Sequence, residues 1–307
     1  MYLVTGGAGF IGSHLVEELV ARSARVRILD NFCSGRWENL TSVADAVEVI
    51  EGDVTNLEVV LEASRGVEYV LHHAAIASVA RSVQDPIETQ RVNVEGTLNV
   101  LLGARQAGVK RFVFASSAAI YGDAATLPIS ERTPHQSLSP YAASKSAGEA
   151  YVGAFAASFD LPAVILRYFN VYGPRQDPAS PYSGVITKFV AALQNGQAPT
   201  ISGDGLQTRD FVYVGDVVHA NLLACACEAA IGQVFNIASG VQTSILQLAG
   251  MLGDVLGRPM EPHFAAPLVG EVRHSRADVS RSRDVLNWQV QVDMPTGLAL
   301  TLAQGGA

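Results

Sequence analysis

A tyrosine and a lysine four positions apart are the residues of this chain best suited to moving a proton. Tyr141 and Lys145 fall in a stretch at 141–158 whose periodicity predicts a helix, and residues i and i+4 share one helix face. A phenol with its ordinary pKa of about 10 is a poor base, so we expect the ammonium of Lys145 to lower the pKa of Tyr141. The pair predicts acid–base chemistry at a substrate hydroxyl, the alternative being a surface pair without a chemical role.

Two adjacent serines form a second candidate group. Ser116 and Ser117 follow a short apolar run at 112–115 that predicts a strand. Ligands of an open parallel sheet bind outside the carboxyl ends of its strands, so we expect one of these hydroxyls to hold or relay a substrate proton. The alternative is a pair of turn serines.

A glycine-rich turn near the N-terminus has the pattern of a phosphate-binding loop. The strand predicted at 2–4 leads directly into Gly6, Gly9 and Gly12, and a helix is predicted near 12–22. Such a turn lets the backbone approach a pyrophosphate, which the helix N-terminus attracts. Asp30, after the strand predicted at 26–29, is placed to accept two ribose hydroxyls and to repel a 2′-phosphate. We therefore predict NAD rather than NADP, the alternative being a glycine turn without a ligand.

Short apolar runs alternate with helical periodicity through the first half of the chain. Strands are predicted at 2–4, 26–29, 47–50, 69–71, 112–115 and 164–166, and helices near 12–22, 57–64, 93–107, 141–158 and 185–194. Apolar strands separated by helices form a parallel sheet covered on both faces. We predict a doubly wound α/β fold, a Rossmann domain, over residues 1–170. Residues 171–307 predict a smaller α/β substrate-binding region, with segments around 210–240 returning to the first domain.

Composition and charge exclude several classes of protein. The 307 residues are 49% apolar and 16% charged, which excludes disorder, and a net charge of −8 without a run of like charges predicts no nucleic-acid or membrane partner. No signal peptide and no stretch of about 18 apolar residues is present, so a cytoplasmic location is expected. The spacing of Cys33, Cys225 and Cys227 predicts neither a disulfide nor a metal site, and His72 and His73 are expected to be packing or loop-fixing residues.

These motifs carry a resemblance to a known family. The sequence resembles an extended short-chain dehydrogenase/reductase at Thr5, Gly6, Gly9 and Gly12, at the turn around Asp53, in the run FASSAAIYG at 114–122, and at Tyr141 with Lys145. Within that superfamily it is most similar, over nearly its whole length, to the NAD-dependent sugar epimerases that act at C4 of UDP-glucose and UDP-N-acetylglucosamine.

The resemblance implies roles for individual residues. Ser117, Tyr141 and Lys145 would be catalytic, with Lys145 also bonding the nicotinamide ribose. For Asp53, which would lie beside the adenine, the alternative is a structural turn. The implied NAD site comprises Gly6, Gly9, Phe10, Ile11, Gly12, Asp30, Asn31, Ser34, Gly35, Asp53, Val54, His73, Ala74, Ala75, Asn93, Ser116, Tyr141, Lys145 and Tyr168.

The residues after Ser117 limit which reactions of the resembled superfamily this chain could catalyse. Dehydratases of the resembled superfamily carry an acidic residue there, whereas this chain has Ala118 and Ala119. Alanine cannot transfer a proton, which leaves removal and return of a hydride through a transient 4-keto sugar. We predict a UDP-hexose 4-epimerase that acts on UDP-glucose and UDP-galactose and on their N-acetylated counterparts. The alternatives are a uronate epimerase, a 4,6-dehydratase, a decarboxylase or a reductase on the same scaffold, or a non-catalytic NAD-binding protein.

The resemblance also supplies a substrate site and a partner. Arg209 matches the family's diphosphate-binding arginine, unless it pairs with Asp210 or with another surface acid. The family's second arginine is Leu268 here, which makes Arg273 a candidate substitute, and Ser275 leaves room for an N-acetyl group. The implied UDP-sugar site comprises Ser78, Ser117, Tyr141, Phe169, Asn170, Gly184, Val185, Arg209, Arg273 and Ser275. Helices near 94–107 and 142–157 correspond to a dimer contact of the resembled enzymes, so a homodimer is expected.

Overall fold

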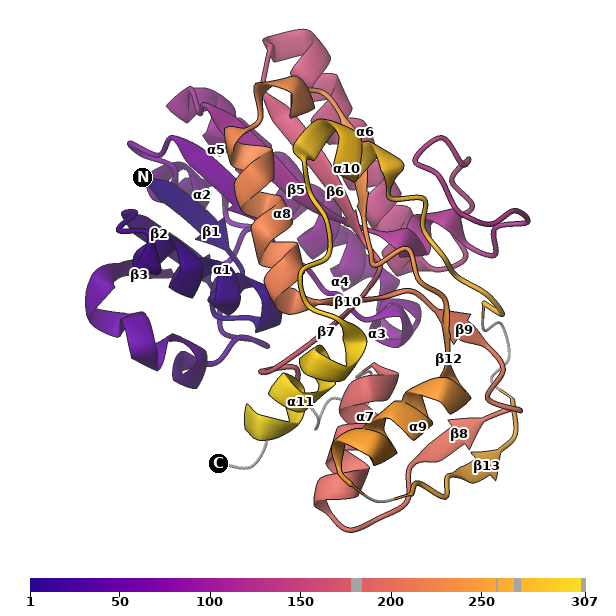
Figure 1. Ribbon diagram of the computed structural model, residues 1–307. Helices are drawn as coiled ribbons and strands as arrows, with labels where there is room; N and C mark the ends of the chain where they lie inside the picture. The colour runs from indigo at the N-terminus through magenta and orange to yellow at the C-terminus, as the bar shows by residue number, and fades with distance from the viewer. Residues whose placement is uncertain (178–183, 258, 268–271, 305–307) are drawn as a thin grey trace.

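The centre of the computed structural model, which describes residues 1–177, 184–257, 259–267 and 272–304, is a parallel β-sheet (Figure 1). Its strands lie in the order β11-β6-β5-β4-β1-β2-β3, and every neighbouring pair is parallel. The strands are β1 (Tyr2–Thr5), β2 (Val26–Asp30), β3 (Val47–Glu51), β4 (Tyr69–His72), β5 (Arg111–Ser117), β6 (Ala163–Tyr168) and β11 (Val234–Ile237). The doubly wound α/β fold and the six predicted strands are confirmed.

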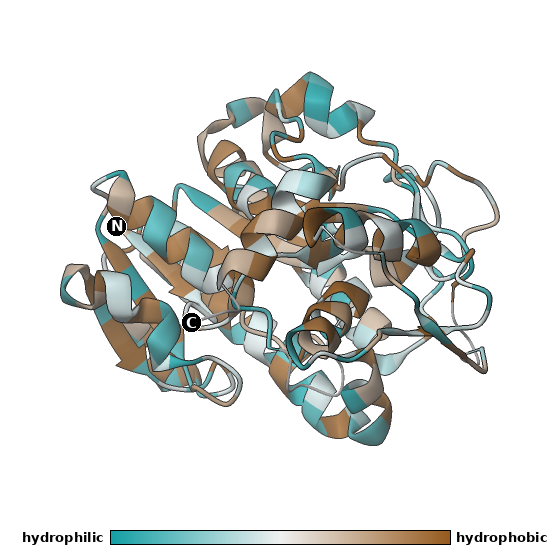
Figure 2. Ribbon diagram, turned by 60° about the horizontal axis from the view of Figure 1, so that its bottom comes forward, coloured by the Kyte–Doolittle hydropathy of each residue, from teal (hydrophilic) through white to brown (hydrophobic). Residues whose placement is uncertain are grey.

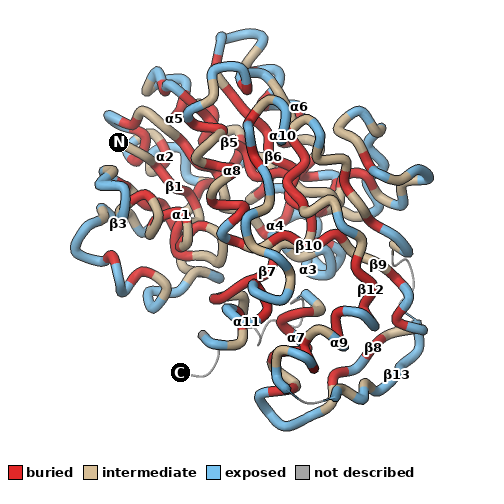
Figure 3. The backbone as a smooth tube through the Cα atoms, viewed as in Figure 1, coloured by how far each residue is buried: buried red, intermediate tan, exposed pale blue. Residues whose placement is uncertain are grey.

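Alternate side chains of these strands pack against two layers of helices. On one face, Val4 and Val113 belong to a hydrophobic cluster with α1 (Phe10–Ala21) and α8 (Val214–Ala226). On the other face, Leu3 and Phe112 pack with α2 (Leu57–Ala63), α5 (Gly96–Ala107) and α6 (Pro140–Phe159). Successive strand residues point to opposite faces, so a strand that is apolar throughout is covered on both. Figure 2 shows hydrophobic residues along the strands, and Figure 3 shows the inner strands of the sheet buried, whereas the edge strand β3 is intermediate to exposed.

Shorter helical segments connect the main elements of the first 170 residues. They are η1 (Trp37–Ala46), α3 (Val79–Gln84), α4 (Pro86–Gln90), the π-helical turn η2 (Arg91–Glu95) and η3 (Ala118–Tyr121). The sheet reverses its strand order between β1 and β4, and doubly wound sheets bind their ligands at that switch point. Across the described ranges, no helix has both the length and the apolar content needed to cross a bilayer.

A smaller lobe follows residue 170 and lies beside the carboxyl edge of the sheet (Figure 1). It contains three strand pairs, β7 (Asn170–Tyr172) with β10 (Phe211–Tyr213), β8 (Thr200–Ser202) with β13 (His263–Ala265), and β9 (Thr208–Arg209) with β12 (Thr243–Ser244). Helices α7 (Val185–Gln194), α9 (Ile245–Val255) and α11 (Met294–Gln304) share a separate hydrophobic cluster with β7, β8 and β10. The chain returns to the sheet through α8, η4 (Glu228–Ala230), β11 and α10 (Ser280–Leu286).

The sequence patterns predict the sheet better than this lobe. The helices predicted near 12–22, 57–64, 93–107, 141–158 and 185–194 correspond to α1, α2, α5, α6 and α7. The short strands of the lobe and helices α8 to α11 were not predicted. A strand of two or three residues has no alternation of its own, because its pairing with a distant segment defines it.

Candidate active site

The carboxyl ends of the parallel strands bring the predicted residues to one edge of the sheet. β1 leads into the glycine turn, β2 ends at Asp30, and β4 is followed by His73. β5 and β6 pair in a register that puts Ser117 opposite Tyr168. Beyond Tyr168 the chain leaves the sheet and enters β7, which lines a cavity of the smaller lobe.

The turn between β1 and α1 is shaped by the absence of side chains. Gly6 has a φ of +70°, and a Cβ atom there would stand 2.8 Å from the backbone nitrogen of Ala74. A Cβ atom on Gly12 would collide with the carbonyl of Gly6. Gly9 is the N-cap of α1 and provides no side-chain bond, so no cap covers the first N–H groups, of Phe10 and Ile11. This geometry fits the pyrophosphate of a dinucleotide such as NAD.

Asp30 is buried beside this turn. Its Oδ2 accepts a hydrogen bond from Ala8 N at 2.9 Å and its Oδ1 accepts one from Phe32 N at 2.8 Å. Burial raises the pKa of Asp30, and the two backbone bonds oppose that rise. Gly35, after Ser34, approaches so closely that a Cβ atom would lie 2.9 Å from Oδ1. Each carboxylate oxygen can accept a second bond, so Asp30 fits the two hydroxyls of a ribose.

Asp53 holds a turn at the same edge. Its Oδ1 accepts bonds from the N and Oγ1 of Thr55 at 2.8 and 2.7 Å, and its Oδ2 accepts one from Asn31 Nδ2 at 2.7 Å. Burial by itself would raise the pKa of Asp53, but these bonds hold it below its ordinary value. The structural turn, offered as the alternative, is therefore present. Contact of Asp53 and Val54 with an adenine stays a prediction.

The two histidines after β4 differ in what they contact. The Nδ1 and Nε2 atoms of His72 lie 2.7 Å from Thr5 Oγ1 and 2.9 Å from Thr97 Oγ1, which confirms a packing residue. His73 Nε2 lies 3.0 Å from the hydroxyl of Tyr168, and burial lowers the pKa of His73 to about 3. Burial also lowers the pKa of His72, so both imidazoles are neutral near pH 7.

Asn93, in the π-helical turn, ties the segment after β4 to α6. Its Oδ1 accepts a bond from Ile76 N at 2.7 Å, and its Nδ2 donates to Ser144 Oγ at 2.9 Å. Ser144 Oγ in turn donates to the carbonyl of Tyr141 at 2.8 Å. Asn93 therefore fixes the backbone near Ala74 and Ala75 relative to the helix that carries Tyr141.

Helix α6 begins just before its reactive residues. Ser139 caps the helix by accepting a bond from Ala142 N at 3.1 Å. Pro140 occupies the first helical position, where an N–H would have no partner inside the helix. Tyr141 and Lys145 consequently lie on its first two turns, and neither is more than 9% exposed.

The ammonium of Lys145 and the phenol of Tyr141 have different partners. Lys145 Nζ donates to the carbonyl of Ala115 at 2.8 Å, while Tyr141 shares a hydrogen bond with the Ser117 side chain. Burial raises the pKa of Tyr141, and the bond with Ser117 lowers it. Without a cofactor, burial dominates and the Ala115 carbonyl holds the ammonium, so a lowering of the Tyr141 pKa by Lys145 stays a prediction for the NAD-bound protein.

The structure separates the two adjacent serines. Ser117 Oγ accepts a bond from Ala119 N at 3.2 Å and is bonded to Tyr141, so it is the hydroxyl suited to relay a proton. Ser116 Oγ instead donates to the buried carboxylate of Glu149. Contact of Ser116 with a cofactor stays a prediction.

Glu149 is a charged residue of this region that the sequence interpretation missed. Its Oε2 lies 2.6 Å from Arg167 Nη2, and its Oε1 accepts a bond from Arg167 Nε at 2.9 Å. Glu149 follows Lys145 by four residues, as Lys145 follows Tyr141. That repeated spacing on one helix face was the available signal.

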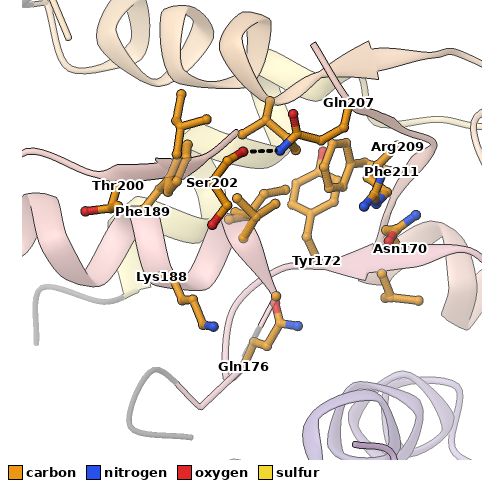
Figure 4. Close-up of a pocket in the computed structure, with 16 residues that line it drawn as sticks. Asn170, Tyr172, Gln176, Lys188, Phe189, Thr200, Ser202, Gln207, Arg209 and Phe211 are labelled. Carbon is orange, nitrogen blue, oxygen red and sulfur yellow. Dashed lines mark hydrogen bonds between the residues drawn. The ribbon is translucent and has the colours of Figure 1, made fainter. Parts of the chain in front are cut away.

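A cavity of about 360 Å³ lies in the smaller lobe (Figure 4). Four predicted substrate residues line it, namely Asn170, Gly184, Val185 and Arg209. Figure 4 shows Asn170 and Arg209 together on one side and Lys188 and Thr200 on the other. The sequence interpretation missed the further polar and aromatic lining residues Tyr172, Gln176, Lys188, Phe189, Thr200, Ser202, Gln207 and Phe211. The size of the cavity and its lining of polar and aromatic side chains suit a nucleotide.

Arg209 does not pair with its acidic neighbour. The carboxylate of Asp210 accepts bonds from the N and Oγ of Ser239 at 2.8 and 2.7 Å, from Gly240 N at 3.0 Å and from Ala277 N at 2.9 Å. Burial raises the pKa of Asp210 to about 6, against the effect of these bonds. Asp210 is thus held by groups other than Arg209. Arg209 lines the cavity wall, where its Nη1 donates to the Thr208 carbonyl at 2.8 Å.

Arg273 lies at a neighbouring hollow rather than in the cavity lining. It forms an exposed two-bond ion pair with Asp204, with nitrogen–oxygen distances of 2.9 and 2.7 Å. Leu268, where the resembled enzymes have an arginine, lies outside the described residues. A diphosphate contact by Arg273 stays a prediction.

The remaining predicted substrate residues are also outside the cavity lining. Ser275 is buried, and Phe169 packs against Tyr121 in a small hydrophobic cluster. Ser78 is the N-cap of α3 and accepts a bond from Arg81 N at 3.0 Å. Contacts of these three residues with a sugar stay predictions.

Comparisons with known proteins agree with this geometry. The chain is 43% identical over 304 residues to the UDP-glucose 4-epimerase of Mycolicibacterium smegmatis, covering 98% of this chain and 96% of that protein. The UDP-glucose 4-epimerase of Thermotoga maritima, solved with UDP-glucose, has a TM-score of 0.94 at 39% identity and covers 99% of this chain and 98% of its own. The UDP-N-acetylglucosamine 4-epimerase of Methanobrevibacter ruminantium, solved with UDP-N-acetylmuramic acid, has a TM-score of 0.95 at 36% identity, with coverages of 99% and 97%. Residues 2–238 match the NAD dependent epimerase/dehydratase family, and the chain belongs to that family.

Proposed function

We propose that this protein is an NAD-dependent UDP-hexose 4-epimerase, an isomerase. The observation that carries the proposal is the position of Ser117 and Tyr141 between the glycine turn after β1 and the cavity that begins at Asn170. A dinucleotide held at the turn and a nucleotide sugar held in the cavity would meet at these two hydroxyls. The full-length similarity to two UDP-sugar 4-epimerases of known structure supports the same reaction.

The reaction requires a proton to leave the sugar and return to it. The hydrogen at C4 of a hexose is not acidic, so the configuration there changes only through a ketone. NAD, when bound, supplies hydride removal and return at C4 and the positive charge of its oxidised ring. Ser117, hydrogen-bonded to Tyr141, would pass the 4-hydroxyl proton to the phenolate form of Tyr141, which becomes the phenol and later returns the proton. Because burial raises the pKa of Tyr141, formation of the phenolate depends on further positive charge, which the oxidised ring together with Lys145 would supply.

The smaller lobe would hold the UDP group. Arg209 and Asn170 lie together at the side of the cavity that continues from β6, where a diphosphate would lead from the uridine toward Tyr141 (Figure 4). A 4-keto sugar has to turn over before the hydride returns to its other face. Binding energy should therefore be concentrated on the UDP group, while the hexose is held by few contacts.

The carboxylates near Ser117 do not favour dehydration. Ala118 and Ala119 follow it directly, and Glu149 is engaged by Arg167. Glu131 Oε1 accepts a bond from Asn236 N at 2.8 Å. Elimination of water needs a general acid and a base beside the sugar, so these contacts favour epimerisation over the dehydratase and decarboxylase alternatives.

The small side chain of Ser275 supports a substrate range that includes N-acetylated sugars. Some of the resembled enzymes carry a bulky aromatic residue at this position, where a serine would leave room for an N-acetyl group, and one similar structure is a UDP-N-acetylglucosamine 4-epimerase. We expect turnover of both UDP-glucose and UDP-N-acetylglucosamine. Kinetics showing turnover of UDP-glucose alone would contradict this size argument.

The proposal also covers the roles of the two regions of the chain and the oligomeric state of the protein. Residues 1–170 would bind NAD and residues 171–307 would bind the substrate, with α8 and β11 returning to the sheet. The protein would form a homodimer through α5 and α6, testable by light scattering at micromolar concentration. Three free cysteines, of which Cys225 is buried, are compatible with a reducing, cytoplasmic location.

Incubation of the purified protein with NAD and separate UDP-sugars, followed by NMR of the products, tests the proposal. Formation of the C4 epimer without net accumulation of NADH is the expected result. A 4-keto-6-deoxy product would indicate a dehydratase instead. Binding of NAD without turnover of any UDP-sugar would indicate a non-catalytic protein.

A further inference from the structure

Glu149 is a buried acid on the reactive face of α6 to which the proposed mechanism gives no part. It lies eight residues after Tyr141 and four after Lys145, and it is 7% exposed. Its carboxylate accepts a hydrogen bond from Ser116 Oγ and two bonds from Arg167. Burial of a carboxylate is costly unless it is paired and bonded, so this position is maintained by specific partners.

Arg167, at the end of β6, is held on all sides. Nε and one N–H of Nη2 point to Glu149, and the other N–H of Nη2 points to His135 Nε2 at 2.8 Å. Nη1 donates to the Tyr121 hydroxyl at 2.8 Å and to the Glu131 carbonyl at 3.0 Å. All five N–H groups of the guanidinium are therefore used. This rigidity fixes the carboxylate of Glu149 as well.

Lys145 and Glu149 contact consecutive residues of β5. Lys145 donates to the Ala115 carbonyl, and Glu149 accepts from the Ser116 hydroxyl. The next residue of the strand is Ser117, the proposed proton relay. These two contacts, made one turn apart on α6, therefore fix the position of the end of β5 relative to Tyr141.

Glu149 also faces Lys145 as an anion among neutral and cationic groups. His72 and His73, which follow β4, are neutral because burial lowers their pKa values. The other titratable groups bonded in the network of Glu149 are Arg167 from β6, the Tyr121 phenol, whose pKa is raised by burial, and His135 in the loop before α6. The pKa of Tyr168, which contacts His73, is also raised by burial. Burial lowers the pKa of Lys145 to about 8, and the charge of Glu149 acts against that fall.

We propose that Glu149 is a positioning residue of the reaction, which keeps Lys145 charged and holds the end of β5 at which Ser117 meets Tyr141. The proposal rests on the proposed function, because it assigns Glu149 a role through the catalytic residues. A purely structural ion pair would instead contribute to stability without acting on Lys145. The two roles can be separated, because only the first changes the pH at which Lys145 loses its proton.

A cycle of four protein variants measures the pH at which Lys145 loses its proton, and this measurement does not depend on enzyme activity. Urea unfolding of the full chain between about pH 6 and pH 10.5 is compared for the wild type and Lys145→Met, and then for Glu149→Gln and Glu149→Gln with Lys145→Met. The difference within each pair isolates the titration of Lys145. In the wild-type pair, the difference should begin to change near pH 8. In the Glu149→Gln pair, it should begin about one pH unit lower, because a nearby opposite charge has been removed.

Glu228→Gln is the matched control. Glu228 Oε1 pairs at 2.7 Å with Arg111, which is also a buried arginine. Arg111 begins β5 and therefore lies at the opposite end of that strand from Ser117. This variant should lower stability and leave the titration of Lys145 where it was. If Glu149→Gln does not fold, Glu149→Gln with Arg167→Met replaces it in the cycle. The expected shift then has the same direction but is smaller, because loss of the Arg167 cation partly offsets loss of the carboxylate.

The pH dependence of turnover gives an independent readout. In Glu149→Gln, the alkaline limb of the kcat/KM profile should move to lower pH by about the same amount as the unfolding difference. Glu149→Asp keeps the charge, so its alkaline limb should stay at the wild-type pH although its rate is lower. Superimposable difference curves in the two pairs, or an unmoved alkaline limb in the folded variant, would overturn the proposal. Absence of epimerisation in the wild type would overturn the proposed function alone, because the unfolding cycle does not depend on it.

Discussion

The reactive edge of the sheet and the cavity of the smaller lobe are built differently, although they would handle one substrate. At the sheet edge, Lys145, Glu149 and Arg167 are each at most 7% exposed, and each is held by bonds to neighbouring elements. In the cavity, Arg209 is half-buried and Lys188 is exposed. Arg209 comes from a strand of two residues, whereas Ser117 ends a strand of seven.

This difference indicates which part of the reaction each region can serve. A dense network of buried bonds holds atoms at fixed distances, which proton transfer requires. A lining of short strands and a helix has fewer contacts and adapts more easily, which suits the recognition of a diphosphate by charge. Substitutions at the sheet edge should therefore change turnover, and substitutions in the cavity should change substrate affinity.

Tyr141→Phe should give the largest effect. The variant keeps the buried ring and removes the hydroxyl bonded to Ser117, so kcat for epimerisation should fall about 100- to 10,000-fold. KM and NAD binding should change little, as measured by kinetics and by cofactor fluorescence. Turnover near that of the wild type would remove Tyr141 from the proton-transfer role.

Lys145→Met should separate stability from chemistry at the same edge. Burial lowers the pKa of Lys145 from 10.5 to about 8, so the folded protein binds this proton less tightly than the unfolded chain does. The buried charge therefore reduces stability below about pH 8, and this cost disappears as the pH rises toward 10.5. The variant should lose turnover, though by less than Tyr141→Phe, yet be more stable than the wild type by up to about 3 kcal/mol at pH 7.

Chemical denaturation at two pH values checks this expectation. The advantage of Lys145→Met should be present at pH 7 and should vanish near the ordinary pKa of lysine. Loss of the bond to the Ala115 carbonyl works in the opposite direction and can reduce the gain. An advantage that persists unchanged at high pH would show that the desolvation of the ammonium is not its cause.

Arg209→Met probes the other region. Removing the guanidinium from the cavity wall should raise KM for a UDP-sugar about 10- to 100-fold, while kcat stays within a few-fold. Arg209→Lys should recover part of the affinity, because it keeps the charge and loses the planar two-bond contact. A fall in kcat with unchanged KM would place Arg209 in the chemistry and would break the distinction between the two regions.

The sequence predicted the sheet edge because its signals are local. The glycine turn, Asp30 and the Tyr141–Lys145 spacing each lie within one element, and the parallel sheet brings these elements together. The roles of Asp53 and Ser116 were harder to predict, since their partners Asn31 and Glu149 lie 22 and 33 residues away. Long-range partners of this kind leave no periodic pattern.

The cavity was predicted only in part for the same reason. Resemblance supplied Asn170, Gly184, Val185 and Arg209, whereas the lining contributed by β8 and by Lys188 has no local motif. β8 exists through its pairing with β13, more than 60 residues later, where Thr200 lies opposite His263. Such a strand cannot be recognised from its own three residues.

Arg273→Ala should produce the smallest effect and sharpens the boundary of the cavity. The Arg273 guanidinium donates two hydrogen bonds to Asp204 at an exposed site. Exposed ion pairs contribute about 0–1 kcal/mol to stability. The variant should therefore unfold within about 1 kcal/mol of the wild type, and KM should rise no more than about threefold. Asp204→Asn is the matched change, because it removes the ion pair with Asp204 and keeps the Arg273 side chain. If Asp204→Asn lowered KM while Arg273→Ala raised it tenfold or more, Arg273 would be the second diphosphate cation, and the UDP site would extend from the cavity into the neighbouring hollow.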